Sequence, residues 1–308
     1  MNKNLSEAPQ IQLSSKDLMS SQGPTLLAQQ ADSIISCSQQ KTQRLHKQGD
    51  MFRASTRRLL QQAGLISGMK VLAVGSGTGD VAFLAAELIG PSGTVVGVER
   101  NLTMLETAWA RARSAGLTQV SFVAGNLRTV ALASDFDTVI GCNSLLYHAD
   151  PVAVLQVGVQ HLRPGGIVAF HEFDFSVIEH LVAAKGAPAL SQQLVCWMSA
   201  GLRRAGAPVQ MGVQLPAAFV EAGLPFPQMR LGSLAGTGPD WAGDDLLAET
   251  LCTILPRLVA YGIIQAGEVD IDTWSERLRA EVVQQRLFIA SGILVGAWTR
   301  VGQVIYNY

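Results

Sequence analysis

Apolar and polar positions alternate in two different rhythms along the first half of the chain. Short valine-rich runs predict buried strands, and they cover residues 70–74, 94–99, 120–125, 137–142 and 167–173. Between these runs apolar residues recur with helical spacing, which predicts helices at 80–89, 102–115 and 151–162. Strands that alternate with helices of this length form a parallel, doubly wound sheet, so the sequence predicts an α/β fold.

The pattern changes after Asp174, where the regular alternation is lost. Helical spacing recurs at four places, and two further segments predict strands, the last of them a strand pair or one long bent strand. The helices are expected at 187–206, 213–223, 242–263 and 270–285, and the strands at 227–234 and 288–301. The expected architecture is a Rossmann-like, doubly wound sheet of about seven strands over residues 66–308, with helical lid insertions within 175–285.

The residues before the sheet differ from it. Residues 1–20 are polar and aperiodic, which predicts a flexible tail. Residues 21–65 are expected to form an N-terminal helical arm in which Gly49 separates two helices. Basic side chains concentrate at 41–58, and both a solvated helix face and a cover over an anionic substrate are open interpretations. The acidic stretch 240–249 is a candidate partner for them.

The clearest candidate site is the glycine-rich turn that follows the first strand, Gly75-Ser76-Gly77-Thr78-Gly79-Asp80. A glycine-rich turn between a strand and a helix lets a ligand approach the backbone and aims free N–H groups at it. Glu99 ends the next strand, and an acid at that position binds the two hydroxyls of a ribose. The combination predicts a nucleoside-containing cofactor.

The spacing of the glycines separates two cofactor classes. The dinucleotide fingerprint is G-x-G-x-x-G, but this chain has G-x-G-x-G and places Asp80 where the last glycine would fall. A carboxylate at the start of the helix disfavours a pyrophosphate and tolerates a zwitterion or a cation. A nicotinamide oxidoreductase is therefore a weak alternative.

Six segments in order resemble the motifs of class I S-adenosylmethionine-dependent methyltransferases, and more closely a bacterial branch that acts on small molecules. They are VLAVGSGTGD (71–80), GPSGTVVGVERN (90–101), FVAGNL (122–127), FDTVIGCNSLLYHADP (136–151), HLRPGGIVAFHE (161–172) and a final strand of the form V-G-A-W-x-R (295–300). The resemblance covers residues 45–301. It implies S-adenosyl-L-methionine as the cofactor.

The resemblance also assigns cofactor-binding roles by position. The glycine loop would pass beneath the methionine part, Glu99 would bind the ribose, and the Asn126 amide would read the adenine amine. The implied cofactor-binding residues are Gly75, Ser76, Gly77, Gly79, Glu99, Arg100, Asn101, Gly125, Asn126, Leu127, Cys142 and Asn143. Two positions depart from the family pattern: Ala73 stands where an acid usually helps to hold the methionine ammonium, and Asn126 stands where the family usually has aspartate.

Candidate catalytic residues follow from where ligands bind. In open α/β sheets ligands lie at the carboxyl ends of the strands. Tyr147 and His148 follow the fourth strand, and His171 and Glu172 end the fifth. Successive strand residues face opposite sides, so only one of His171 and Glu172 is expected on the cofactor side. A general base must reach the proton that it removes, and all four remain candidates.

Composition and charge limit the classes of partner that the protein could bind. The 308 residues carry a net charge of −1, and 48% of them are hydrophobic, which opposes both disorder and general nucleic-acid binding. The four cysteines have no metal-ligand spacing, so no metal is expected. The N-terminus lacks the apolar core of a signal peptide, and the apolar run from Leu287 is too short to span a bilayer. We expect a cytoplasmic protein without a membrane partner, and the sequence leaves a homodimer open.

The sequence thus predicts methyl transfer from S-adenosylmethionine to a small, hydrophobic molecule of the secondary-metabolite type. The alternative is a cyclase or rearrangement catalyst of the same fold, which would use the charge of the cofactor without consuming it. A protein or RNA methyltransferase is disfavoured because the chain has no Asn-Pro-Pro-Tyr-type motif and no extended basic face. Apolar residues of the second half are expected to supply the substrate pocket, among them Trp197, Met198, Met211, Trp241, Leu246, Leu247 and Tyr261.

Overall fold

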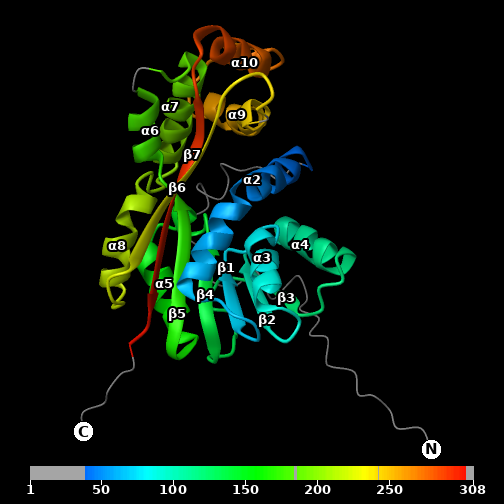
Figure 1. The fold of residues 1–308 in the computed structure, drawn as a ribbon, viewed down its shortest axis with the longest axis vertical. Coiled ribbons are helices and arrows are strands. Elements are labelled where there is room, and N and C mark those ends of the chain that lie inside the picture. Colours follow the sequence, from blue (N-terminus) through cyan, green and yellow to red (C-terminus); the bar gives the residue numbers. More distant parts are fainter. Residues whose placement is uncertain (1–38, 184–185, 242, 303–308) are drawn as a thin grey trace, which may run out of the picture.

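The computed structural model describes residues 39–183, 186–241 and 243–302. The expected tail at 1–20 and the first part of the helical arm lie outside these residues. The described chain forms one seven-stranded sheet in the order β3-β2-β1-β4-β5-β7-β6 (Figure 1). Its strands are β1 Lys70–Val74, β2 Thr94–Glu99, β3 Val120–Ala124, β4 Phe136–Cys142, β5 Leu162–Phe173, β6 Gln228–Gly236 and β7 Ile289–Arg300. The predicted Rossmann-like sheet is confirmed.

Strand direction divides the sheet into two parts. The neighbours from β3 to β5 pair in parallel, whereas β7 is antiparallel to both β5 and β6. Parallel strands need helical crossovers, and these leave both faces of a sheet covered. The helices are α2 Gln39–Ala63, α3 Asp80–Ile89, α4 Leu102–Ser114, η1 Leu145–Tyr147, α5 Pro151–Gln160, α6 Phe175–Ala183, α7 Ala189–Arg204, α8 Met211–Glu221, α9 Gly243–Ala260 and α10 Trp274–Gln285.

Each face of the sheet has its own core. Alternate residues of the central strands, such as Val71 and Ile140, pack with α2, α3 and α4 on one face. The intervening residues, such as Leu72 and Phe170, pack with α5 and α8 on the other. The period of two along each strand therefore decides which helices a residue meets.

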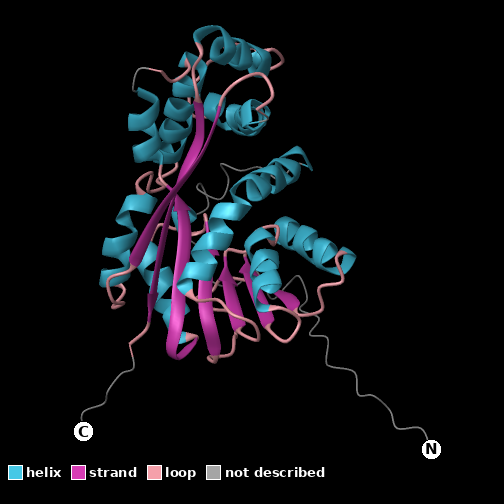
Figure 2. Cartoon of the chain, viewed as in Figure 1, coloured by secondary structure: helices cyan, strands magenta, loops and turns pink. Residues whose placement is uncertain are grey.

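A third cluster lies apart from the central sheet. Figure 2 shows β6 and β7 continuing beyond the parallel strands, with helices gathered around their far end. Buried residues of α7, α9 and α10 pack together there, among them Leu194, Leu251, Trp274 and Leu278. Helices α7, α9 and α10 thus form a layer at the carboxyl end of the parallel strands, whereas α8, which is also inserted between β5 and β7, packs on the face of the sheet.

The expected break at Gly49 is wrong, because α2 runs continuously through this residue. The glycine does not end the helix but allows a neighbouring segment to approach it closely. A Cβ atom at position 49 would lie 3.2 Å from the Asp80 Cγ atom. Gly49 therefore lets α2 pass directly against the start of α3, where the glycine-rich turn ends.

Two smaller differences between prediction and structure concern β5 and the helix that follows it. The strand starts at Leu162 and not at the expected residue 167, because Leu162 pairs with Phe136 before an irregularity in the register. Helix α6 follows immediately after β5 and was not expected. Its start is capped by Asp174, whose Oδ1 accepts hydrogen bonds from Ser176 Oγ at 2.6 Å and Val177 N at 2.9 Å.

Candidate active site

A cavity of about 710 Å³ lies at the carboxyl ends of the parallel strands. One end is lined by the glycine-rich turn and by the residues that follow β2, β3 and β4. The other end is lined by Phe173, Phe175 and residues of α7 and α9. One face of α2, including Gly49, Phe52 and Thr56, borders the cavity along its length. Ligand sites of open α/β sheets are found at this edge.

The glycine-rich turn holds a backbone that other residues could not adopt without strain. Gly75, Gly77 and Gly79 have φ angles of 60°, 53° and 95°, in the left-handed region. A Cβ atom at Gly75 would also lie 2.8 Å from Ser144 Cβ, so this position is sterically closed. Gly75, Ser76 and Gly77 line the cavity, whereas Gly79 lies behind them at the start of α3.

Glu99 connects this turn to the next strand. Its Oε2 accepts a hydrogen bond from Gly77 N at 2.9 Å, and its Oε1 accepts from Arg100 N and Asn101 N at 2.8 Å each. A carboxylate offers about four acceptor sites, so three backbone donors leave room for roughly one more hydrogen bond. The side chain lines the cavity and also orders the turn.

Further along this wall, Gly125, Asn126 and Leu127 border the cavity beside Arg100 and Asn101. The Asn126 side-chain oxygen accepts a hydrogen bond from Arg128 N at 3.0 Å. The predicted reading of an adenine amine by this amide would therefore depend on the second lone pair of the same oxygen.

The segment after β4 has an unusual backbone that β5 holds in place. Asn143 adopts a φ of 50°, donates its N–H to His171 O at 2.9 Å, and accepts from Phe173 N at 2.9 Å through Oδ1. Asparagine tolerates this left-handed conformation better than most residues. Cys142 and Asn143 line the cavity.

Glu172 supports the short helix η1 from below. Its Oε1 accepts hydrogen bonds from Ser144 N and Leu145 N at 3.0 Å, and its Oε2 accepts from Leu146 N at 3.2 Å. The side chain is fully buried, and desolvation raises its pKa to about 7 although these donors act in the opposite direction. Glu172 thus caps the helix that carries Tyr147.

His171 lies on the opposite face of β5, beneath α2. Its Nδ1 is 3.1 Å from Thr56 Oγ1, and the Thr56 hydroxyl donates to Phe52 O at 3.2 Å. His171 Nδ1 and Thr56 thus share a hydrogen bond, and the buried Nε2 has no hydrogen-bond partner in the described chain. Burial, with a contribution from the charge of Arg230, lowers the pKa of His171 to about 4.

These positions correct the expectation that one residue of the His171–Glu172 pair faces a ligand. Both side chains are fully buried, and neither lines the cavity. The alternation of β5 turns one toward α2 and the other toward η1. Tyr147 and His148 do line the cavity, so they are the remaining catalytic candidates. Burial, together with Arg100 and Arg128, lowers the pKa of His148 to about 4, and its imidazole is neutral at pH 7.

The buried histidine predicts a pH dependence of stability. Because the pKa of His171 is lower in the folded protein than its ordinary value of 6.5, the folded state binds fewer protons between about pH 6.5 and 4. Its contribution is complete above pH 6.5 and is lost as the pH falls toward 4. His171→Gln should remove roughly 1–3 kcal/mol of this decline.

Urea unfolding of the wild type and of His171→Gln at a series of pH values measures this difference. The contributions of His148 and Glu172 cancel in the comparison because both groups titrate in both proteins. Parallel curves for the two proteins would show that His171 does not titrate as described.

Ala73, the departure from the family pattern, is fully buried and does not line the cavity. Acidic side chains from α2 and α3 line the cavity instead. Asp80 lines the cavity, where its Oδ1 lies 2.8 Å from Arg111 and its Oδ2 accepts from Thr78 Oγ1 at 2.7 Å. Asp50 of α2 also lines the cavity. These carboxylates are candidates for the role that Ala73 cannot fill.

The far end of the cavity is apolar, and sequence reasoning found little of it. Phe52 and Phe173 meet edge to face with ring centroids 5.2 Å apart. Of the seven apolar residues expected to form the pocket, only Met198 lines it. Five of the others pack with the hydrophobic cores, and Leu246 is also buried. The amphipathic pattern indicates that a face is buried, but it does not show what covers that face. The residues that sequence reasoning missed are Phe52, Thr56, Phe173, Phe175, Leu202, Thr250, Ile254, Arg257 and Leu258.

Within the described ranges, no three histidine, cysteine, aspartate or glutamate side chains are grouped so that they could hold a metal ion. No described helix has both the length and the apolar character needed to cross a membrane.

Comparisons with known proteins agree with this geometry. Residues 65–201 match a family model described as a methyltransferase domain. A demethylmenaquinone methyltransferase of Lactococcus lactis subsp. lactis (strain IL1403) is 33% identical over 123 residues, which cover 40% of this chain and 48% of the relative. A nocamycin O-methyltransferase of Saccharothrix syringae is 38% identical over 118 residues, which cover 38% and 42%.

The similarity extends further in structure than in sequence. The YcgJ protein of Bacillus subtilis superposes with a TM-score of 0.52 at 13% identity, over 82% of this chain and 99% of that chain. At this identity the likeness shows the fold alone. The chain spans about half the length of the curated relatives that it matches.

Proposed function

We propose that this chain, of which residues 65–201 match a methyltransferase domain, is a class I S-adenosylmethionine-dependent methyltransferase that transfers a methyl group from S-adenosylmethionine to a small hydrophobic molecule. The observation that carries the proposal is the form of the cavity. A single space joins a polar end, built by the glycine-rich turn and Glu99, to an apolar end beneath α7 and α9. A cofactor and an acceptor would meet where the two ends join.

The residues at the polar end fit the proposed cofactor. Glu99 retains acceptor capacity for a ribose hydroxyl, and Gly75 and Gly77 bring bare backbone against the ligand. Leu127 and Met104 supply apolar surface for a flat base. Asp80 or Asp50 would balance the charge of an ammonium group in the absence of an acid at position 73.

When bound, S-adenosylmethionine supplies an activated methyl group on a positively charged sulfur. The chain contributes alignment and exclusion of water, since methyl transfer requires the acceptor, the carbon and the sulfur to lie in line. Phe52, Phe173 and Phe175 surround the apolar end and keep it dry. Tyr147 and His148 stand at the cavity wall, where the neutral imidazole can receive a proton from the acceptor.

The nature of the acceptor follows from the cavity and from the relatives. An apolar lining with few polar groups suits a small hydrophobic molecule. The relatives named for demethylmenaquinone and nocamycin support the same class of acceptor. The chain matches only part of each relative, so their own substrates are not assigned to it.

Cofactor consumption tests this proposal against the rearrangement alternative. A methyltransferase forms one S-adenosylhomocysteine for each product molecule, whereas a rearrangement catalyst turns over many times on one cofactor molecule. We expect S-adenosylhomocysteine and methylated product in equal amounts when the purified protein is incubated with S-adenosylmethionine and a panel of hydrophobic acceptors. Chromatography coupled to mass spectrometry measures both. Product without S-adenosylhomocysteine would favour the rearrangement catalyst.

A further inference from the structure

The terminal strand of the sheet, β6, carries an exposed apolar patch. Phe226 precedes β6 and is 81% exposed, and within the strand Met229 and Leu231 are 41% and 62% exposed. Met229 and Leu231 are two residues apart, so their side chains lie on one face of the sheet. These three residues, the β6 patch, leave roughly 400 Å² of apolar surface in water, a size at which a patch on a soluble protein is often functional.

The patch exists because the helix on that face of the sheet stops one strand short. In β7, Ala297 pairs with Met229 and Val295 pairs with Leu231. Both β7 residues are buried in the core that includes α8, whereas their partners in β6 are exposed. Helix α8 therefore covers β7 and leaves this face of β6 in contact with water.

The outer edge of β6 lacks the features that usually protect an edge strand. Proteins keep such strands from pairing with other chains through short length, proline, charged side chains or a bulge. Strand β6 has nine residues without proline or lysine, and its irregularity in register lies beyond Ser233. From Met229 to Ser233 no strand of the described ranges pairs with this edge.

The one charged residue of β6 lies on the other face of the strand. Arg230 is placed between Met229 and Leu231 in the sequence, so its side chain points to the opposite side of the sheet. There its Nη1 donates a hydrogen bond to Gln62 Oε1 of α2 at 3.3 Å. No charge of β6 therefore lies within the patch, where it would repel a second copy of the same strand.

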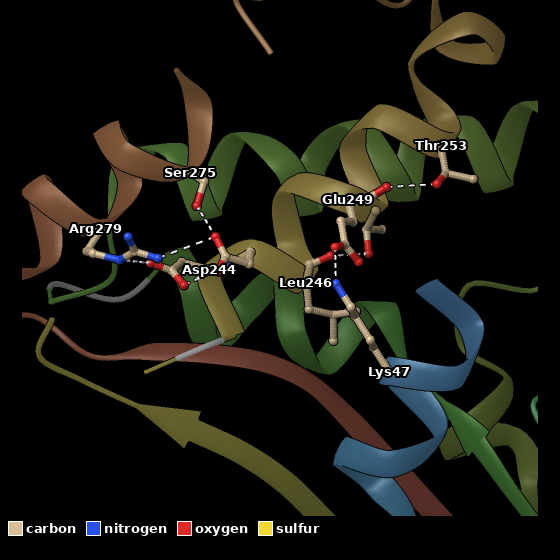
Figure 3. Close-up of polar contacts among 9 residues, drawn as sticks. Lys47, Asp244, Leu246, Glu249, Thr253, Ser275 and Arg279 are labelled. Atoms are coloured by element: carbon tan, nitrogen blue, oxygen red, sulfur yellow. Dashed lines mark hydrogen bonds and ion pairs between the residues drawn. The ribbon is translucent and has the colours of Figure 1, made fainter. Parts of the chain in front are cut away.

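The layer of helices above the sheet presents a different kind of surface. Figure 3 shows α9, where Asp244 pairs with Arg279 of α10 at 2.5 Å and Glu249 pairs with Lys47 of α2. Charged groups are costly to remove from water and are depleted at the centres of protein interfaces, so this surface is a poor contact for another protein. The β6 patch consists of apolar side chains, whose removal from water is favourable.

We propose that two copies of this chain form a dimer in which their β6 strands pair antiparallel. Leu231 lies opposite Leu231 of the partner subunit, and Met229 lies opposite Ser233 of the partner subunit, so that the sheet continues through both copies. Such a contact is self-complementary about a two-fold axis, and it covers both edges at once. The two patches and the backbone between them bury on the order of 1,000 Å², the lower limit for a stable interface. This inference does not depend on the proposed methyl transfer.

Sedimentation velocity on the full chain, from low to high micromolar concentrations, tests the proposal. We expect the wild type to reach twice the mass of one chain. Leu231→Lys places two like charges opposite each other and should weaken association by about a hundredfold or more. Ile66→Lys is the matched control, because Ile66 is 63% exposed and lies in the loop between α2 and β1. It adds the same charge at an equally exposed site and should leave the dimer unchanged.

An exchange of charge separates direct contact from loss of folding. Leu231→Lys and Leu231→Glu should each sediment as monomers. An equimolar mixture of the two should restore the dimer, because opposite charges then meet across the two-fold axis. Thermal melts of each variant verify that it is folded.

A wild type that sediments as a monomer at every concentration would overturn the proposal and assign the patch to a different partner. Association of Leu231→Lys as tight as that of the wild type would also overturn it. A mixture of the folded lysine and glutamate variants that stays monomeric would show that the two β6 strands do not lie side by side, which equally contradicts the proposal.

Discussion

Truncation of Glu172 to alanine should lower the free energy of unfolding by roughly 3–5 kcal/mol. The carboxylate accepts hydrogen bonds from the backbone N–H groups of Ser144, Leu145 and Leu146, and the whole arrangement is buried. Alanine leaves those donors unpaired in the interior and opens a space the size of a carboxyethyl group. Each buried donor without a partner costs about 1–3 kcal/mol.

Urea unfolding at one fixed pH measures this loss, with Glu172→Gln as the matched control. Glutamine keeps the volume and one carbonyl acceptor, so it should retain part of the stability. Because Glu172 caps η1, the alanine variant should also bind S-adenosylhomocysteine less tightly, through displacement of Asn143 and Tyr147. An alanine variant as stable as the wild type would show that the three donors find other partners and that Glu172 does not position the segment.

Glu99→Ala should weaken binding of S-adenosylhomocysteine by about 10- to 100-fold. Two effects add in this variant. It removes the acceptor proposed for the ribose, and it releases Gly77 N, which Glu99 Oε2 holds at 2.9 Å. The residue ends a strand and lines the cavity, so the core does not depend on it.

Calorimetric titration measures the affinity for S-adenosylhomocysteine, and two further variants serve as controls. Glu99→Gln keeps one acceptor oxygen and should lie between the wild type and alanine. Glu106→Ala removes an exposed acid from α4 and should change nothing. Wild-type affinity in Glu99→Ala would remove Glu99 from the cofactor site.

The sequence predicts the central sheet well because each of its signals is local. A valine run such as 94–99 and a helix stop such as Gly90-Pro91 depend on neighbouring residues only, and β2 and α3 fall within these limits. The glycine-rich turn is predicted for the same reason. Gly49 is misread because a glycine can serve either to end a helix or to let another segment approach, and only the tertiary neighbour Asp80 decides between them.

The catalytic candidates show where such reasoning stops. Strand alternation separates His171 from Glu172, but it does not reveal that α2 covers one and η1 the other, so that both are buried. Arg257 carries no motif, and its place in the cavity depends on the packing of α9 against α7 and α2. Residues that act through tertiary neighbours leave no signal in their own sequence.

The order of strands has a consequence for the way the chain folds as it is synthesised. The middle of β5, at 168–170, is almost completely buried in the finished protein, partly because β7 pairs along it. The 115 residues from 174 to 288 must be made first, which takes roughly 6–23 s at ribosomal speed. During that time β5 is an open edge with unpaired N–H and C=O groups, and β6 has no neighbour. Strand β7 must then insert between two strands that have already been made, so chaperones that shield an exposed strand edge would have their largest effect on this chain before β7 has been synthesised.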